Sequence, residues 1–247
     1  MKMSLNTLLV LVAFFLTMPV IGYAGLPERY AVEREVTASV TKDMATPYIG
    51  NPSIAGRRCV DGKPVSQERE LIEFWGSMDC QYCSIREVVK AQKAHPDWCI
   101  VVRHLPSGQD ALGKALAYEA LAKFSSASAI IFWDDVVPTS DLPVSHPYQG
   151  SLIRAFSDAN IQHEAFVSAM EKDAVQNLNQ DIEAGTGVIP STPTFVLEGI
   201  RFSSCDFTVK QLEEALDLAK KARSGDEKAL QEIIRVITRG HLNEPML

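Results

Sequence analysis

The motif Cys80-Gln81-Tyr82-Cys83 constrains this chain more than any other feature, because it lies between a predicted strand and a predicted helix. Before it, Leu71–Trp75 is a short run of strand-forming apolar residues that ends at a Gly-Ser pair. After it, apolar residues recur at helical spacing over 85–92, and Cys99–Val102 then has the composition of a buried strand. This strand, helix, strand order predicts two parallel strands joined by a crossover helix.

The position of the two cysteines predicts their chemistry. Backbone N–H groups at a helix N-terminus lack partners within the helix, and they stabilise a thiolate placed there. Cys80 is therefore the predicted nucleophile, and Cys83, one turn later, is the predicted buried thiol that resolves a mixed disulfide. A structural disulfide and half of a metal site are the alternative interpretations. A zinc site needs more ligands, and the five histidines are scattered at positions 95, 104, 146, 163 and 241, so we predict no metal.

The rest of the chain alternates between helical and strand patterns. From residue 111 to residue 184 the apolar spacing is helical. A strand at 193–197, a Glu-Gly turn, a strand at 200–202 and two amphipathic helices follow. We predict an α/β fold in which one domain (56–247) is built from about 56–106 and 186–247, with a helical subdomain inserted at about 107–185.

A second motif, Gly187-Val188-Ile189-Pro190-Ser191-Thr192-Pro193-Thr194-Phe195, completes a pattern that resembles the DsbA-type periplasmic oxidoreductases. The resemblance runs from about Leu71 to Leu216 and implies a thioredoxin-like fold. It implies disulfide exchange with unfolded or partly folded proteins, no dissociable cofactor, and a membrane redox partner that resets the cysteine pair. In this family Pro193 corresponds to a cis-proline that faces the pair. Thr192 would then dock an extended substrate segment, with Gln81 and Tyr82 beside it.

The resemblance also implies a role for Glu73, as a buried acid that relays the proton of Cys83. Seven positions separate Glu73 from Cys80, one more than is usual in the family. A one-residue bulge at Gly76-Ser77 would absorb the extra position. Asp79 should raise the pKa of Cys80. Gln81-Tyr82 also replaces the Pro-His of the strongly oxidising members, which predicts a weaker oxidant.

The N-terminus has the features of an export signal. Lys2 precedes an apolar run of about 14 residues, too short for the roughly 20 of a membrane span. Cleavage before Gly25 would leave 1–24 as a signal peptide, 25–55 as an arm of unknown purpose, and the mature protein in the periplasm. The net charge of −7 argues against a nucleic-acid partner.

Three further cysteines have no motif. Disulfides persist in an exported protein, so Cys59 could pair with Cys99 or with Cys205, and the sequence leaves this open. The function also stays open within and beyond its class. The alternatives are a disulfide isomerase or reductase of the same fold, and a copper-binding or chaperone module that uses the thiols without turnover.

Overall fold

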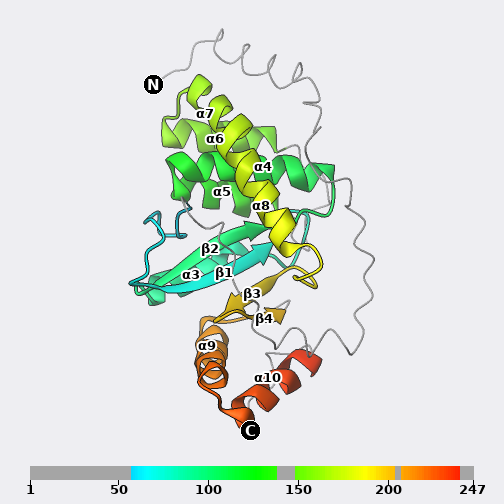
Figure 1. Ribbon diagram of the computed structural model, residues 1–247. Helices are drawn as coiled ribbons and strands as arrows, with labels where there is room; N and C mark the ends of the chain where they lie inside the picture. Colours follow the sequence, from blue (N-terminus) through cyan, green and yellow to red (C-terminus); the bar gives the residue numbers. More distant parts are fainter. Residues whose placement is uncertain (1–56, 138–147, 204–206, 240–247) are drawn as a thin grey trace. The chain divides into compact units, whose positions relative to one another are not determined.

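The computed structural model describes residues 57–137, 148–203 and 207–239 (Figure 1). All of them fall within one compact unit of the chain. The predicted signal peptide 1–24, the predicted arm 25–55 and Cys205 lie outside the described residues. The described residues all fall within the predicted α/β domain, 56–247.

The described strands form one mixed sheet with the order β2-β1-β3-β4. Their bounds are β1 Glu70–Gly76, β2 Trp98–His104, β3 Thr194–Leu197 and β4 Ile200–Ser203. Strand β1 pairs in parallel with β2 and antiparallel with β3, and β3 pairs antiparallel with β4. The turn between β3 and β4 is Glu198-Gly199, and both residues have positive φ, as a tight two-residue hairpin requires. The predicted parallel pair and the predicted final hairpin are confirmed.

The helices divide into three groups along the chain (Figure 1). The crossover helix α3, Ile85–Ala94, joins β1 to β2. Between β2 and β3 lie α4 Gln109–Phe124, α5 Ser126–Val136, α6 Gln149–Ala159, α7 His163–Ala169, the π-helical turn η2 Met170–Ala174 and α8 Val175–Gly185. After the sheet come α9 Val209–Arg223 and α10 Glu227–Arg239. The predicted α/β order with an inserted block of helices is therefore present.

Side chains on the two faces of β1 build two apolar layers, because alternate residues of a strand point to opposite faces. Phe74 lies on one face, with ring centroids 5.1 Å from Phe195 and 6.0 Å from Trp133. Trp75 lies on the other face, packed against Ile189. A Cβ on Gly185 at the end of α8 would approach the Trp75 ring to 2.7 Å. The close packing of α8 on this face therefore depends on that glycine.

The segment Arg57–Val65, which we call the hook, covers the open edge of the sheet at β2. The backbone N–H of Val60 donates to the carbonyl of Ile100 at 2.8 Å. Within the hook, Arg58 and Pro64 form an isolated antiparallel bridge. Edge strands expose unpaired backbone groups, so the hook satisfies part of an edge that would otherwise be open.

A disulfide fastens the hook to β2. It joins Cys59 to Cys99, whose Cα atoms are 5.0 Å apart. Both cysteines are buried against Val101, with Val65 and Leu71 packed beside them. This settles the pairing that the sequence left open between Cys99 and Cys205.

A buried ion network joins the hook to the sheet and to the inserted helices. The Arg57 guanidinium lies 2.9 Å from an Asp181 carboxylate oxygen and 3.3 Å from Glu119. Burial alone would lower the pKa of Arg57, but Glu119 and Asp181 raise it. Arg103 bridges Asp181 and Glu73. Loss of one partner would leave an uncompensated buried charge, so this network fixes how the three parts of the domain meet.

Candidate active site

The Cys80–Cys83 motif forms a separate turn between β1 and α3. The backbone N–H of Cys80 donates to the carbonyl of Ser77 at 3.2 Å, and that of Cys83 donates to the carbonyl of Cys80 at 3.0 Å. Helix α3 begins only at Ile85, after Ser84 in an extended conformation. The predicted place of the motif, between a strand and a helix whose apolar pattern starts at Ile85, is confirmed. The cysteines lie just before the helix and not in its first turn, because they close a turn of their own.

The two sulfur atoms have opposite surroundings. Cys80 is half-buried, and hydrogen bonds from the Cys83 thiol, the Tyr82 backbone N–H and the Thr192 hydroxyl lower its pKa to about 7, against burial and Asp79. Cys83 is fully buried. Burial is the main cause that raises the pKa of Cys83, and its contact with Cys80 raises it further. One thiol is thus poised to ionise near neutral pH, while its neighbour holds its proton.

The loop before β3 meets the turn at Cys80. The thiol of Cys80 donates to the backbone carbonyl of Thr192 at 3.3 Å, across 112 positions of sequence. The Thr192–Pro193 peptide bond is cis. The fold therefore brings together Cys80, Cys83, Thr192 and Pro193, the four residues that the two motifs supply.

The other predicted substrate-contacting residues lie on the surface of the turn. Gln81 and Tyr82 are both exposed, and Tyr82 keeps 49% of its surface in solvent, the largest value among the exposed large apolar side chains of the described residues. An exposed aromatic ring beside a reactive thiol offers an apolar contact to a partner chain.

Glu73 belongs to the buried ion network. It accepts a hydrogen bond from the Trp75 indole at 2.9 Å, and the Arg103 guanidinium lies 3.6 Å away. Burial raises the pKa of Glu73, against Arg103 and the indole. A raised pKa suits a carboxyl group that relays protons. The charged groups that influence the pKa of Glu73 belong to the buried ion network.

The predicted bulge is absent from this part of the chain. The register of β1 with β2 is continuous through Gly76, which pairs with His104. The additional residue between Glu73 and Cys80 is accommodated in the turn after β1. There the hydroxyls of Ser77 and Ser107 donate to Asp79. Asp79 raises the pKa of Cys80 as predicted, although its effect is smaller than those of burial and the hydrogen bonds.

Sequence reasoning missed the role of Trp133. Its indole N–H donates to the backbone carbonyl of Cys83 at 2.9 Å. Helix α5 of the inserted block therefore supports the Cys80–Cys83 turn through this hydrogen bond. A Cβ on Gly76 would lie 2.9 Å from the Trp133 ring. Trp133 looked like a core residue in the sequence, and only the Gly just before the turn hinted at a close contact there.

No cluster of three or more His, Cys, Asp or Glu side chains in the described ranges could hold a metal ion. Likewise, none of the helices there has the length and apolar character needed to cross a bilayer.

Comparison with known proteins gives matches at the level of structure. No family model matches the chain, and no curated protein matches it in sequence. The thiol-disulfide exchange protein alpha-DsbA2 from Wolbachia pipientis superposes with a TM-score of 0.51 at 15% identity, over 75% of this chain and 98% of the other. A thioredoxin-like oxidoreductase from Silicibacter pomeroyi gives 0.50 at 21%, over 62% and 88%.

A variant of ScsC from Proteus mirabilis is also similar, with a TM-score of 0.49 at 16% identity, over 74% of this chain and 78% of the other. At such identities the superpositions inform about the fold. Together with the mixed sheet, the crossover helix and the helical block between β2 and β3, the Wolbachia and Silicibacter superpositions lead to one conclusion. The chain has a DsbA-like thioredoxin fold with an inserted helical subdomain.

Proposed function

We propose that this protein is an exported thiol–disulfide oxidoreductase that exchanges disulfides with protein substrates through Cys80 and Cys83. The observation that carries the proposal is the difference between the two sulfurs. Cys80 is half-buried with a pKa of about 7, whereas Cys83 is buried with a raised pKa. Such a pair has one good nucleophile and leaving group, and one thiol protected from other reactions.

The exchange follows from this difference. In the oxidised pair, a substrate thiolate attacks the sulfur of Cys80, and the Cys80–Cys83 bond breaks. Cys83 takes the electron pair and then a proton, which its raised pKa favours. A second substrate thiolate attacks the substrate sulfur of the mixed disulfide, and Cys80 leaves as a thiolate, which its lowered pKa favours. The same steps in reverse reduce a substrate disulfide.

The substrate class is proposed from the surface beside Cys80. The Thr192 backbone lies next to the reactive sulfur, and the Tyr82 ring is exposed on the adjacent turn. An extended segment can pair with backbone groups at such a loop, which adds a strand and needs no particular sequence. Unfolded or partly folded proteins present such segments, so they are the proposed substrates.

Location and partners complete the proposal. The Cys59–Cys99 disulfide suits an oxidising compartment, which supports export to the periplasm through residues 1–24. Because the electrons reside in the cysteine pair, turnover needs a redox partner that resets it, for which we propose a membrane protein. No dissociable cofactor is required.

The test is disulfide transfer to reduced, unfolded ribonuclease A, followed by the return of ribonuclease activity. The oxidised protein should transfer disulfides, and Cys80→Ser should abolish the transfer. Cys83→Ala cannot form the donor disulfide and should not transfer either. With scrambled ribonuclease, whose disulfides the Cys80 thiolate can attack, Cys83→Ala should instead accumulate a mixed disulfide between Cys80 and the substrate. Lys90→Gln, on the exposed surface of α3, is the matched control and should behave as the parent. Transfer that survives Cys80→Ser would contradict the proposal.

A parallel assay distinguishes the subclasses. Scrambled ribonuclease regains activity only if wrong disulfides are rearranged, which requires a reduced Cys80 to attack them. Faster recovery with scrambled than with reduced substrate would assign an isomerase, and the opposite order would assign an oxidase. Stoichiometric Cu(I) binding at Cys80 and Cys83 without transfer in either assay would assign a binding module.

A further inference from the structure

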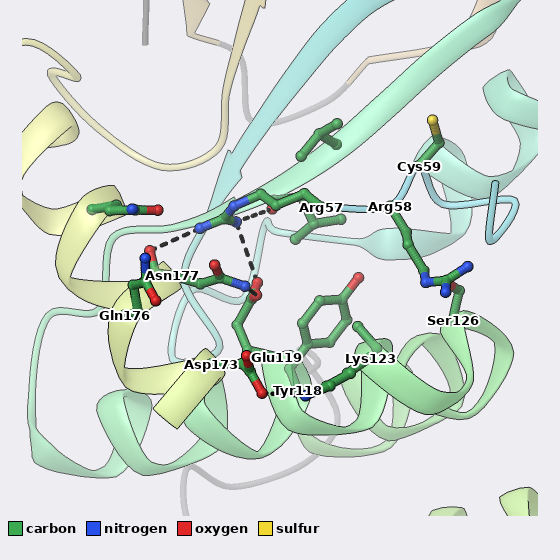
Figure 2. A pocket seen from close by; sticks show the side chains of 14 residues that line it. Arg57, Arg58, Cys59, Tyr118, Glu119, Lys123, Ser126, Asp173, Gln176 and Asn177 are labelled. Atoms are coloured by element: carbon green, nitrogen blue, oxygen red, sulfur yellow. Dashed lines mark hydrogen bonds and ion pairs between the residues drawn. The ribbon is translucent and has the colours of Figure 1, made fainter. Parts of the chain in front are cut away.

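Buried polar side chains hold two separate regions of this domain in place. Beside the hook, Arg57 donates to Glu119, and Figure 2 shows these two side chains directed toward each other in a pocket. That contact joins the hook to α4. Thr194 at the start of β3 is also fully buried, but it follows directly after Pro193. Its hydroxyl therefore lies beside the loop that meets Cys80.

The Thr194 hydroxyl makes two hydrogen bonds. It donates to the backbone carbonyl of Ser191 at 2.7 Å. The Ser203 hydroxyl oxygen lies 2.6 Å from the Thr194 hydroxyl oxygen. A hydroxyl has a single hydrogen, and Thr194 gives its hydrogen to the carbonyl, so Ser203 is the donor in the second bond. The two bonds run from β4 through β3 to the loop.

This side chain closes the segment Ser191–Pro193, which we call the proline loop. Pro193 has no N–H to offer, and no backbone N–H of the described residues donates to the Ser191 carbonyl. The Thr194 hydroxyl supplies that donor. Between the two closed ends lies Thr192, whose carbonyl accepts a hydrogen bond from the Cys80 thiol at 3.3 Å. A shift of the proline loop would therefore move Thr192 relative to the reactive sulfur.

Packing alone does not account for a threonine at this place. Valine has nearly the same shape and suits a buried strand. A buried hydroxyl is unfavourable unless it is hydrogen-bonded. The hydroxyl of Thr194 is compensated by its bonds to Ser191 and Ser203, and the first of these bonds reaches the proline loop.

We propose that Thr194 is a positioning residue, whose hydroxyl fixes the proline loop so that Thr192 stays beside the Cys80 sulfur. Ser203 orients that hydroxyl toward Ser191. The proposal deepens the proposed function, and its consequence for substrates rests on that function. The effect on Cys80 itself can be measured whether or not the protein exchanges disulfides.

The first experiment measures the rate at which iodoacetamide alkylates Cys80 in the reduced protein as the pH is varied. Hydrogen bonding to Thr192 lowers the pKa of Cys80. Thr194→Val should therefore raise the alkylation midpoint by about half a pH unit to one unit, the worth of one hydrogen bond. Thr194→Ser keeps the hydroxyl and loses only a methyl group, so it should keep the midpoint of the parent. Thr208→Val makes the same exchange at the N-cap of α9 and should keep it as well.

A purely structural threonine would give other results. An unchanged or lowered midpoint in Thr194→Val would overturn the proposal, and so would equal shifts in Thr194→Val and Thr194→Ser. If Thr194→Val does not fold, Ser203→Ala decides the question, because Ser203 is partly exposed and its loss frees the Thr194 hydroxyl to turn away. A raised midpoint in Ser203→Ala supports the proposal, and an unchanged midpoint overturns it.

The second experiment measures disulfide transfer to reduced ribonuclease A over a range of substrate concentrations. If the proline loop docks the substrate, Thr194→Val should raise the KM by about five-fold, the worth of one hydrogen bond, and Thr194→Ser should keep the KM of the parent. A parent protein that does not transfer disulfides would contradict the proposed function, while the alkylation midpoints would still decide the role of Thr194. A parent that transfers, with the same KM in Thr194→Val, would overturn the consequence for substrates.

Discussion

Two pairs of cysteines occupy different surroundings in this protein. Cys59 and Cys99 form a disulfide at the outer edge of β2, where 1% and 0% of their surfaces are exposed. Cys80 and Cys83 carry free thiols in the turn after β1, and Cys80 is half-buried. The first pair joins positions 40 residues apart, whereas the second closes a single turn. Both pairs have the same chemistry available, and the fold makes one inaccessible and the other reactive.

The surroundings of each sulfur atom decide its role. Cys59 accepts a hydrogen bond from the Arg69 guanidinium at 3.2 Å, which would favour its thiolate as a leaving group. Burial nevertheless keeps an attacking thiolate away from it. Cys80 has weaker donors, but it is reachable from solvent and lies beside the Thr192 carbonyl. Access therefore outweighs polarisation in separating the structural pair from the proposed redox pair.

The largest predicted effect concerns the structural disulfide between Cys59 and Cys99. Replacing Cys59 and Cys99 together by alanine should lower the free energy of unfolding by about 4 kcal/mol, from the entropy of a loop of 40 residues. Urea unfolding of the oxidised protein measures this loss, with Lys90→Gln as the control. Disulfide transfer through Cys80 should be retained. A double variant that is as stable as the parent would show that the hook holds without its disulfide.

The second prediction concerns the pH dependence of the reduced redox pair. Cys80 should react with iodoacetamide with a midpoint near pH 7, below the ordinary value of 9.0. Cys83→Ala should move the midpoint upward, because the Cys83 thiol is the largest contributor to the shift. A group with a lowered folded pKa stabilises the protein above its unfolded pKa, and that stability is lost as the pH falls. The reduced protein should therefore gain stability between about pH 7 and pH 9 relative to Cys80→Ser.

A third prediction concerns the support of the turn from α5. Trp133→Phe keeps an aromatic ring but leaves the buried carbonyl of Cys83 without its donor. The free energy of unfolding should fall by about 1–3 kcal/mol, and the alkylation midpoint of Cys80 should also change. Trp98→Phe, at the start of β2, is the matched control and should leave that midpoint unchanged. An unchanged midpoint in Trp133→Phe would mean that the indole serves packing alone.

The smallest effect belongs to Asp79, whose charge raises the pKa of Cys80. Asp79→Asn removes the charge and keeps an acceptor oxygen for one of the Ser77 and Ser107 hydroxyls, while its NH₂ group can donate to the other. The alkylation midpoint should move down slightly, and the reaction at pH 6.5 should accelerate. Glu87→Gln, in the first turn of α3, is a control for the loss of one carboxylate. A midpoint that moves up would contradict the electrostatic account.

The sequence was sufficient to predict the local elements and the two motifs of the site. The Cys80–Cys83 spacing, the strand before it and the Thr192–Pro193 motif are each written in consecutive residues. The structure confirms the α/β order and the inserted helices. Local sequence patterns do not show which residues far apart in the sequence come together in the fold. The choice between Cys99 and Cys205 as the partner of Cys59 is an example, because periodicity carries no information about it.

Other features depend on packing between distant elements. The indole of Trp133 reaches the turn across 50 positions, and Arg57 reaches Asp181 from the hook to α8. Neither contact has a sequence spacing that could signal it. The spacing of apolar residues predicted a helix from Ile85, but it did not show that Cys80 and Cys83 close a turn of their own before that helix.

The most direct test of the account is a redox titration of both cysteine pairs in one protein. Cys205→Ser removes the cysteine outside the described residues, and glutathione buffers set the potential. Alkylation and mass spectrometry then quantify each pair. The account predicts that Cys80–Cys83 equilibrates between about −270 and −120 mV, the range of catalytic pairs, while Cys59–Cys99 stays oxidised throughout. A Cys80–Cys83 pair that fails to equilibrate, or a Cys59–Cys99 pair that titrates in its place, would contradict it.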